Sequence, residues 1–470
     1  MPPITFSGIA SGIDGEAIIK ALIDAKKTQN APFEAKVANA ENENKALEEF
    51  STKLLTLSDS VKNFLTLSGS SVSKTGVSSN PDAADVSAGS NALAGTTTFT
   101  VQQLATTATT SFADSFSELT TAVAPGLSPP ATMQITVGTG ATAETVDVTI
   151  DSTTTVDQLQ AKINAASASG KVRASLVNVG TSGSPQYRLV VSSTRSGVES
   201  GSLQINVPSE VTSLGALQIG SSQDAKDAII DLDGLGTVSR PSNQITDLIP
   251  GVTINLKQAG SGPVTVSVTN DADKTAKKLN DVITAFNAVM KYSRENSTID
   301  RVVDANGKPT NKYGTLARTR IDERAVEQLR GSFSSLNSNV EGSAVRVFAD
   351  LGITTQKDGT LGFDTEKFMQ SVAADPVAVD NLVHQFADKV GSANGIVADY
   401  TKYQGQLEVA TKSNEDQIKG ITDRLNQIQD NLDKQTQALR LQFSKLESTI
   451  AKLNSSGEAL TSLITGAAPK

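Results

Sequence analysis

The chain of 470 residues has no cysteine and no tryptophan, and its only histidine is His384. Without cysteine there can be no disulfide, no thiolate metal ligand and no cysteine nucleophile. A single histidine is more commonly a structural residue with satisfied hydrogen bonds than a general base. We therefore predict a protein that is not an enzyme and that has no cofactor, no catalytic residues and no metal site.

Clustered positive charge and long apolar runs are also lacking. The net charge is −9 and the basic residues form no cluster, so nucleic acid is not expected as a partner. No segment approaches the ~20 apolar residues that span a bilayer, and the first residues contain neither the basic leader nor the apolar run of a secretory signal. If the protein is exported, we expect a route without a cleaved signal peptide.

A heptad repeat near the C-terminus is the strongest pattern that the sequence contains. Apolar residues recur every seventh position, and a second row accompanies them at spacings of three or four, which makes one apolar stripe on a long helix. Such a stripe requires a partner helix. The residues predicted to pack in this coiled coil are Ile418, Leu425, Leu432, Leu439, Phe443, Leu446, Ile450, Leu453 and Leu460, with Ile464 as a further member of the second row.

The apolar stripe changes register once along this helix. Gln435 stands where an apolar residue is expected, and the second row then moves from plus three to plus four. This is typical of a stutter, at which a coiled coil locally unwinds. A polar residue in the seam helps to fix register and partner number.

Two helices are predicted near the N-terminus. The first begins at the N-cap residue Asp14 and is interrupted by Pro32. The second helix carries a coiled-coil-like face, which could pack on part of the C-terminal stripe and so bring both ends of the chain together. Its face consists of Leu47, Phe50, Leu54, Leu57, Val61 and Phe64.

The middle of the chain is predicted to be mostly β. Alternating apolar residues indicate strands, including 98–104, 133–137, 146–150, 187–192 and 245–249, and residues 156–166 form a short helix. The fold class is therefore α+β multidomain: a helical coiled-coil stalk made from both chain ends, with mostly β head domains inserted between them.

Helical periodicity returns after residue 273, with a helix at 316–329, a hairpin at 352–363, and helix starts at Asp364 and Asp375. Together these elements predict five domains. They are an N-terminal helical leg (1–66), an inner β head domain (67–110 and 220–272), an outer β/α head domain (111–219), a helical stalk domain with a β-hairpin (273–404), and a C-terminal coiled-coil leg (405–470).

Two short motifs that resemble ligand sites are better interpreted as turns. Gly138-Thr139-Gly140 and the following residues fit a dinucleotide-binding loop, but the segment after it alternates like a strand instead of opening a helix. Asp231 and Asp233 begin like a calcium loop, but the other oxygen ligands and the terminal glutamate are missing. Both motifs therefore predict connections between strands.

Several of these stretches occur in the order found in one family. Ser11-Gly12-Ile13-Asp14 resembles an opening motif that usually has leucine in place of Ile13, and Phe99, Val101 and Gln103-Leu104-Ala105 resemble the first β motif. Together with later stretches, quoted below, they resemble the flagellar filament cap family, also called hook-associated protein 2. The later stretches are Leu159, Ile163-Asn164-Ala165-Ala166, Tyr187-Arg188-Leu189-Val190, Asp233-Gly234, Leu351-Gly352-Ile353, Asp358-Gly359 and Gln442-Phe443.

The resemblance implies a homo-oligomeric ring at the tip of a bacterial flagellum, outside the cell. Helical legs would point into the filament, and β heads would form a plate under which exported flagellin folds and inserts. The implied partners are further copies of the chain, flagellin, hook–filament junction proteins and an export chaperone. The implied route is the flagellar type III export channel, which agrees with the absence of a signal peptide.

Two other functions remain open from the sequence. A junction or adhesive surface protein would bind host ligands through its serine- and threonine-rich β heads. A hydrolase would use paired carboxylates, although no pair is marked by a motif. The heptad stripe and the inserted β region favour the filament cap over both.

Overall fold

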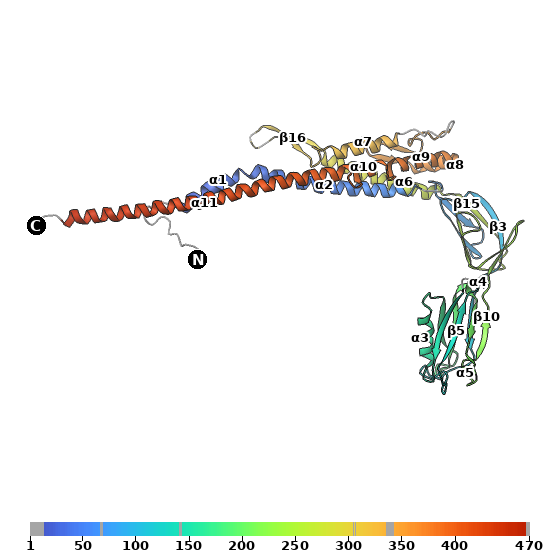
Figure 1. Ribbon diagram of the computed structural model, residues 1–470. Helices are drawn as coiled ribbons and strands as arrows, with labels where there is room; N and C mark the ends of the chain where they lie inside the picture. The colour runs from blue at the N-terminus through green and yellow to red at the C-terminus, as the bar shows by residue number, and fades with distance from the viewer. Residues whose placement is uncertain are drawn as a thin grey trace. The chain divides into compact units, whose positions relative to one another are not determined.

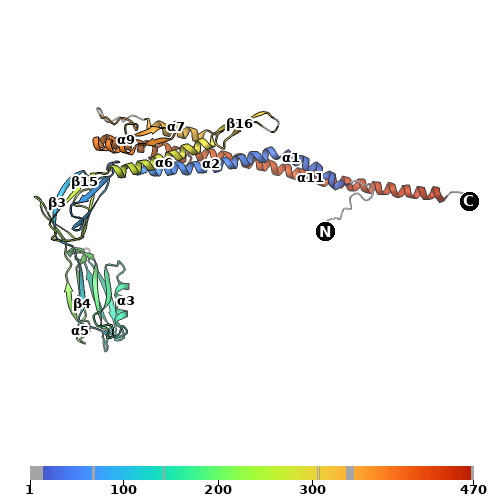
Figure 2. The same cartoon turned by 180° about the vertical axis from the view of Figure 1, so that it is seen from behind.

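The computed structural model describes residues 14–65, 69–140, 143–303, 305, 307–334 and 343–466. The opening motif at residues 11–13 lies outside the described residues, as do Ala141 and Thr142 of the glycine loop and the side chain of Ile464. The chain divides into two units, 1–65 with 276–470 and 66–275. The first unit is mostly helical and the second is mostly β (Figures 1 and 2).

The helical unit begins with α1, which starts where the sequence predicts because the Asp14 carboxylate accepts a hydrogen bond from the Ala17 amide at 3.0 Å. Pro32 stands in the first turn of α2, where its missing N–H costs nothing. The helices are α1 (Gly15–Thr28), α2 (Ala31–Lys62), α6 (Ala272–Asn296), α7 (Ile321–Phe333), α8 (Thr365–Ala374), α9 (Pro376–Gly391), α10 (Ile396–Thr401) and α11 (Gln406–Gly466).

Two β-hairpins complete the helical unit: β16 (Ile299–Val303) with β17 (Pro309–Tyr313), and β18 (Ile353–Thr355) with β19 (Leu361–Phe363). The second was predicted, as were the caps Asp364 and Asp375, which accept hydrogen bonds from the backbone of α8 and α9. The predicted start of α7 at residue 316 was wrong. Arg320, just before the helix, has a left-handed backbone with φ of 54°, so the preceding turn cannot continue into α7.

In the β unit, one core is built from strands at both ends of the segment. Its sheets have the orders β1-β15-β3-β11-β12 and β13-β14-β2, and the predicted strand at 245–249 is confined to β13 because the chain turns after Ile245. The strands are β1 (Lys74–Ser78), β2 (Ala84–Ala88), β3 (Gly95–Gln103), β11 (Ala228–Leu232), β12 (Gly236–Arg240), β13 (Gln244–Ile245), β14 (Val252–Leu256) and β15 (Pro263–Asn270).

A second core lies between β3 and β11 in the sequence. Its sheets have the orders β10-β4-β8-β7 and β6-β5-β9, and α3 covers part of the core with buried Leu159 and Ile163. The elements are β4 (Thr107–Phe112), β5 (Ala131–Val137), β6 (Glu144–Ile150), α3 (Val156–Ala166), β7 (Val172–Asn178), β8 (Tyr187–Ser196), α4 (Val198–Gly201), β9 (Leu203–Asn206), α5 (Ser209–Thr212) and β10 (Ile219–Gln223).

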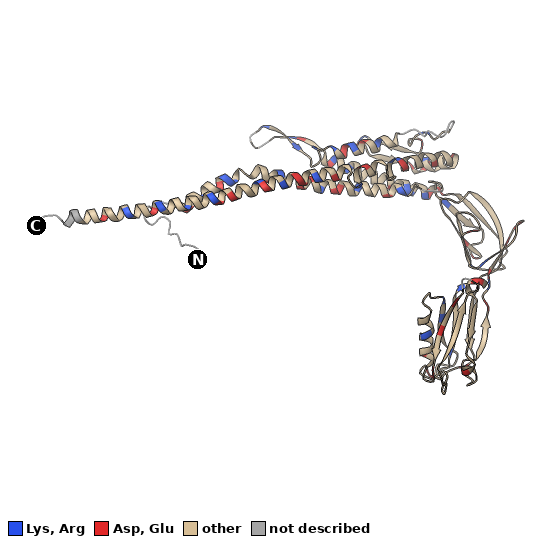
Figure 3. Cartoon of the chain, viewed as in Figure 1, with Lys and Arg blue, Asp and Glu red and all other residues tan. Residues whose placement is uncertain are grey.

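These observations confirm the α+β class, with helices from both chain ends and β structure inserted between them. Both ligand-like motifs lie where one strand is followed by its antiparallel neighbour, β5 by β6 and β11 by β12. The five domain boundaries stay a prediction. Figure 3 shows charged residues of both signs along the helices and a β unit that carries few.

Candidate functional site

Helix α11 runs antiparallel to α2: later residues of α11 contact earlier residues of α2. The Asn414 side chain donates hydrogen bonds to Glu43 Oε1 and Asn44 Oδ1 at 2.8 and 2.9 Å. Farther along, the Arg424 guanidinium lies 4.7 Å from the centre of the Phe33 ring. The predicted pairing of N-terminal and C-terminal helices is therefore present in the chain.

Beyond Phe33, α11 follows α1. Lys26 Nζ donates a hydrogen bond to Gln435 Oε1, and the Arg440 guanidinium donates two bonds to the Glu16 carboxylate at 2.8 and 3.0 Å. The bond to Glu16 raises the pKa of Arg440. Exposed pairs of this kind contribute little to stability because solvent screens them, so they set the register of the helices more than their stability.

All six residues of the N-terminal face predicted from the sequence are buried; five lie on α2, and Phe64 follows its end. The Phe50 ring stacks on Tyr292 of α6, with 6.3 Å between ring centres, and α2 also contacts α9 and α10. The helices of the same chain therefore contribute much of the cover of this face. The exposed fractions of the six residues are 1% for Leu47, 0% for Phe50, 0% for Leu54, 1% for Leu57, 0% for Val61 and 0% for Phe64.

The predicted residues of α11 fall into three groups. Leu432 is buried with an exposed fraction of 4%, and three other leucines are exposed, Leu446 at 48%, Leu453 at 65% and Leu460 at 60%. We call these three exposed residues the leucine row. The remaining members are partly buried, and they are Ile418, Leu425, Leu439, Phe443 and Ile450.

In the structure, the residue that faces inward after Leu432 is Thr436, at plus four, and not Gln435, at plus three. Gln435 is exposed, whereas Thr436 is partly buried and, with Leu432 and Leu439, continues the inward-facing stripe. The reason is that Gln435 reaches sideways to Lys26, while the Thr436 hydroxyl bonds to the Leu432 carbonyl of its own helix at 2.7 Å.

The leucine row lies where α11 has outrun the described part of α1. Arg440 of α11 contacts Glu16, which lies one residue inside the start of α1. About 26 further residues of α11, or roughly 39 Å of helix, therefore extend past the start of α1. In both Figure 1 and Figure 2, no other helix or strand accompanies this last part of α11. An exposed apolar stripe on an isolated helix is marginal in water, so the leucine row is a candidate assembly surface.

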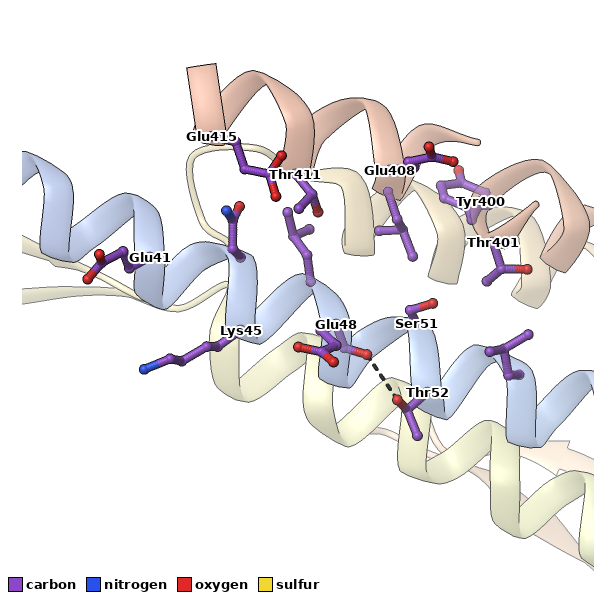
Figure 4. Close-up of a pocket in the computed structure, with 14 residues that line it drawn as sticks. Glu41, Lys45, Glu48, Ser51, Thr52, Tyr400, Thr401, Glu408, Thr411 and Glu415 are labelled. Atoms are coloured by element: carbon purple, nitrogen blue, oxygen red, sulfur yellow. Dashed lines mark hydrogen bonds between the residues drawn. The ribbon is translucent and has the colours of Figure 1, made fainter. Parts of the chain in front are cut away.

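A second surface feature is a groove of about 880 Å³ between α2 and the segment formed by α10 and α11. Its floor includes the buried side chains of Leu47, Tyr400 and Leu407, and burial raises the pKa of Tyr400. Four exposed carboxylates line it, and Figure 4 shows them along both walls. They are Glu41, Glu48, Glu408 and Glu415, against one lysine, Lys45. We call this feature the acidic groove.

Sequence reasoning missed both the acidic groove and the β16–β17 hairpin. The groove carboxylates form two pairs, each with a seven-residue spacing, but the pairs lie on segments far apart in sequence, and the spacing alone does not bring them together. The hairpin had a recognisable signal in the sequence, the dipeptide Asn306-Gly307 between the segments 299–303 and 309–313.

The described residues give no support to metal or membrane chemistry. No group of three or more His, Asp or Glu side chains is placed to hold a metal ion within the described ranges. No helix in the described part of the chain combines the length and the apolar character needed to cross a bilayer.

Comparison with known families gives three matches along the chain. Residues 11–108 match the family described as "Flagellar hook-associated protein 2 N-terminus", and residues 225–455 match "Flagellar hook-associated protein 2 C-terminus". Residues 132–195, in the second β core, match the "Flagellin hook IN motif". The first two matches describe the two ends of one family and together span well over half of the chain.

Individual relatives agree with this result. The flagellar hook-associated protein 2 of Escherichia coli K12 is 24% identical over 488 residues, covering 98% of both chains. The A-type protein of Pseudomonas aeruginosa is 27% identical over 252 residues, so the chain spans about half the length of that relative, 50%. The crystal structure of the flagellar cap protein FliD D1-D2-D3 domains from Escherichia coli is similar with a TM-score of 0.57 at 23% identity, over 80% of this chain and 99% of that one.

The paired terminal helices, the inserted β region and these matches place the chain among structural proteins of the flagellum. The chain belongs to the flagellar hook-associated protein 2 family, the family of flagellar cap proteins.

Proposed function

We propose that the protein forms an oligomeric cap at the distal end of a bacterial flagellar filament and promotes the folding and insertion of exported flagellin. The protein acts outside the cell, without catalysis, after export through the flagellar channel. Its partners are further copies of itself, flagellin, hook–filament junction proteins and an export chaperone. Family membership and the leucine row support this proposal.

The leucine row is the observation on which the mechanism rests. Three large apolar side chains at a seven-residue spacing stand exposed on a helix that has outrun its described partner. Fully burying a leucine gains about 1.5–3 kcal/mol, so a neighbouring helix in the assembled cap would stabilise each leg. Contacts made by only a few side chains can also be exchanged, which a cap needs each time a flagellin subunit is inserted.

The double substitution Leu453→Asp/Leu460→Asp tests this function. Both side chains are exposed, so the variant is expected to keep the circular dichroism spectrum and melting temperature of the parent chain. Introduced carboxylates cannot be buried against a neighbour without a large desolvation cost, so assembly should fail. In a strain that lacks its own cap protein, we expect short or absent filaments and monomeric flagellin in the medium.

Ser448→Asp/Ser455→Asp is the matched control, with the same seven-residue spacing and the same added charge on an exposed part of α11. It should restore normal filaments. Filaments of normal length from the leucine variant would contradict the proposed function of the leg. The alternative, an adhesive protein acting through the β unit, predicts that deleting the whole chain leaves filaments intact and flagellin retained.

A further inference from the structure

The β16–β17 hairpin exposes an apolar face. Its register pairs Ile299 with Tyr313 and Val303 with Pro309, and directly opposed residues of an antiparallel pair lie on the same face. Ile299 is exposed to 58%, Val303 to 69% and Tyr313 to 44%. Figures 1 and 2 both show the hairpin extending away from the helices of its unit.

The opposite face of the hairpin is more polar and consists of Asp300 with Lys312 and Val302 with Thr310. A two-stranded hairpin alone is marginally stable in water, and an uncovered apolar face makes it less so. The hairpin is therefore a structure that gains stability when another surface covers its apolar face.

Positive charge accompanies the apolar face. Arg301 lies between Ile299 and Val303 on this face, and the Arg318 guanidinium lies 4.9 Å from the centre of the Tyr313 ring. A surface that covers the hairpin must therefore combine an apolar floor with negative charge at its rim.

The acidic groove has this combination. Its lining includes Leu55, which is exposed to 46%, together with the buried Leu47, Leu407 and Tyr400, and four carboxylates against one lysine give it a negative rim. From Glu41 to Leu55 the groove follows α2 for about 21 Å, and a strand of 5 residues is about 17 Å long.

We propose that the apolar face of the β16–β17 hairpin of one copy binds in the acidic groove of a second copy. Both surfaces occur once on each chain, so the contact is head to tail and generates a ring when the rotation between copies closes. This inference rests on the proposed self-assembly and names the surfaces that perform it on the helical unit.

Cross-linking between copies tests the contact without background, because the chain has no cysteine. Asn311→Cys, on the apolar face, and Ser51→Cys, in the groove, are placed in separate full-length chains with different affinity tags. The two chains are mixed and treated with a short bismaleimide. They should give severalfold more product carrying both tags than the control pair, Thr310→Cys and Ser51→Cys, in which the hairpin cysteine lies on the opposite face. Equal yields from the two pairs would overturn the proposal. A chain that carries both Asn311→Cys and Ser51→Cys provides a further check: cross-links found only within that chain, and never between copies, would overturn the proposal as well.

Charge exchange provides a second test that separates this proposal from the function. Arg301→Glu and Glu48→Arg should each lower the assembled fraction measured by native mass spectrometry, and the double variant should restore it. A double variant no better than either single one would overturn the contact. Normal assembly by Arg301→Glu would also overturn the contact. It would not contradict the proposed cap function, because that function is tested separately by the leucine variant in the filament assay.

Discussion

Asp322 is a carboxylate that α7 carries into the interior of the helical unit, with an exposed fraction of 0%. Its Oδ2 accepts hydrogen bonds from the hydroxyls of Ser293 and Ser297 at 2.6 and 2.5 Å, while Oδ1 has no partner. Burying a charged group is costly unless it is hydrogen-bonded. Ser293 of α6 and Ser297, just after that helix, therefore supply the hydrogen bonds that this buried carboxylate needs.

Asp322→Ala should lower the free energy of unfolding by about 2 kcal/mol, because two serine hydroxyls then lose their acceptor in a buried site. Asp322→Asn keeps a side-chain oxygen for one or both bonds and should cost less than the alanine change. Urea denaturation followed by circular dichroism measures both variants. Equal stability of Asp322→Ala and the parent chain would show that the serine bonds contribute nothing.

At the scale of elements, α2 and α9 approach closely because Gly391 has no side chain. A Cβ added to Gly391 would lie 2.9 Å from Val61 Cγ1, closer than van der Waals contact allows. Val61 is a β-branched residue with few rotamers and is itself fully buried. The distance between the two helices is therefore fixed by this pair of residues.

Gly391→Ala is expected to destabilise the chain by about 1–3 kcal/mol through overpacking. In a Val61→Ala background the same change should cost clearly less, because the methyl group that it meets is gone. Gly420→Ala is the control: a Cβ there meets nothing within 4 Å, so the better helix propensity of alanine should stabilise α11 by about 0.5–1 kcal/mol. Additive effects of Val61→Ala and Gly391→Ala in thermal unfolding would contradict the packing argument.

At the scale of the whole molecule, the chain is built by nested insertion. Thr106 and Lys226, which flank the second β core, exchange backbone hydrogen bonds at 2.9 and 3.2 Å. The ends of the first core also meet, since β1 pairs with β15 and the Asp271 amide donates to the Ser73 carbonyl at 2.7 Å. Each inserted part therefore begins and ends at one place, as independent domains commonly do.

Residues 106–226 alone should fold, with a β-rich circular dichroism spectrum and one cooperative thermal transition. Residues 69–275, with 107–225 replaced by a short glycine–serine linker, should fold as well, because the linker joins two residues that already hydrogen-bond. Fragment 69–227 without its second core is the control, since it lacks β11 to β15 and leaves β1 and β3 unpaired. If either of the first two fragments were unfolded, the nested arrangement would not reflect independent folding.

The sequence predicted much of the helical framework because local signals decide it. Asp14, Asp364 and Asp375 cap helices where their side chains reach the first free amides, and Val156 to Ala166 is helical as its periodicity indicates. Prediction failed where a single backbone conformation decides the outcome. The left-handed Arg320, which delays α7, is an example, since arginine, unlike glycine or asparagine, does not indicate such a position.

The sequence by itself determined that two apolar helical faces exist at opposite ends of the chain, because heptad spacing depends only on the helical repeat. Only the tertiary structure decided which of these residues are covered. Phe50 lies under Tyr292 of the same chain, whereas Leu453 has the same spacing and stays exposed. The physical reason is that burial depends on how far neighbouring helices extend in space, and α11 is longer than the described helices that flank it.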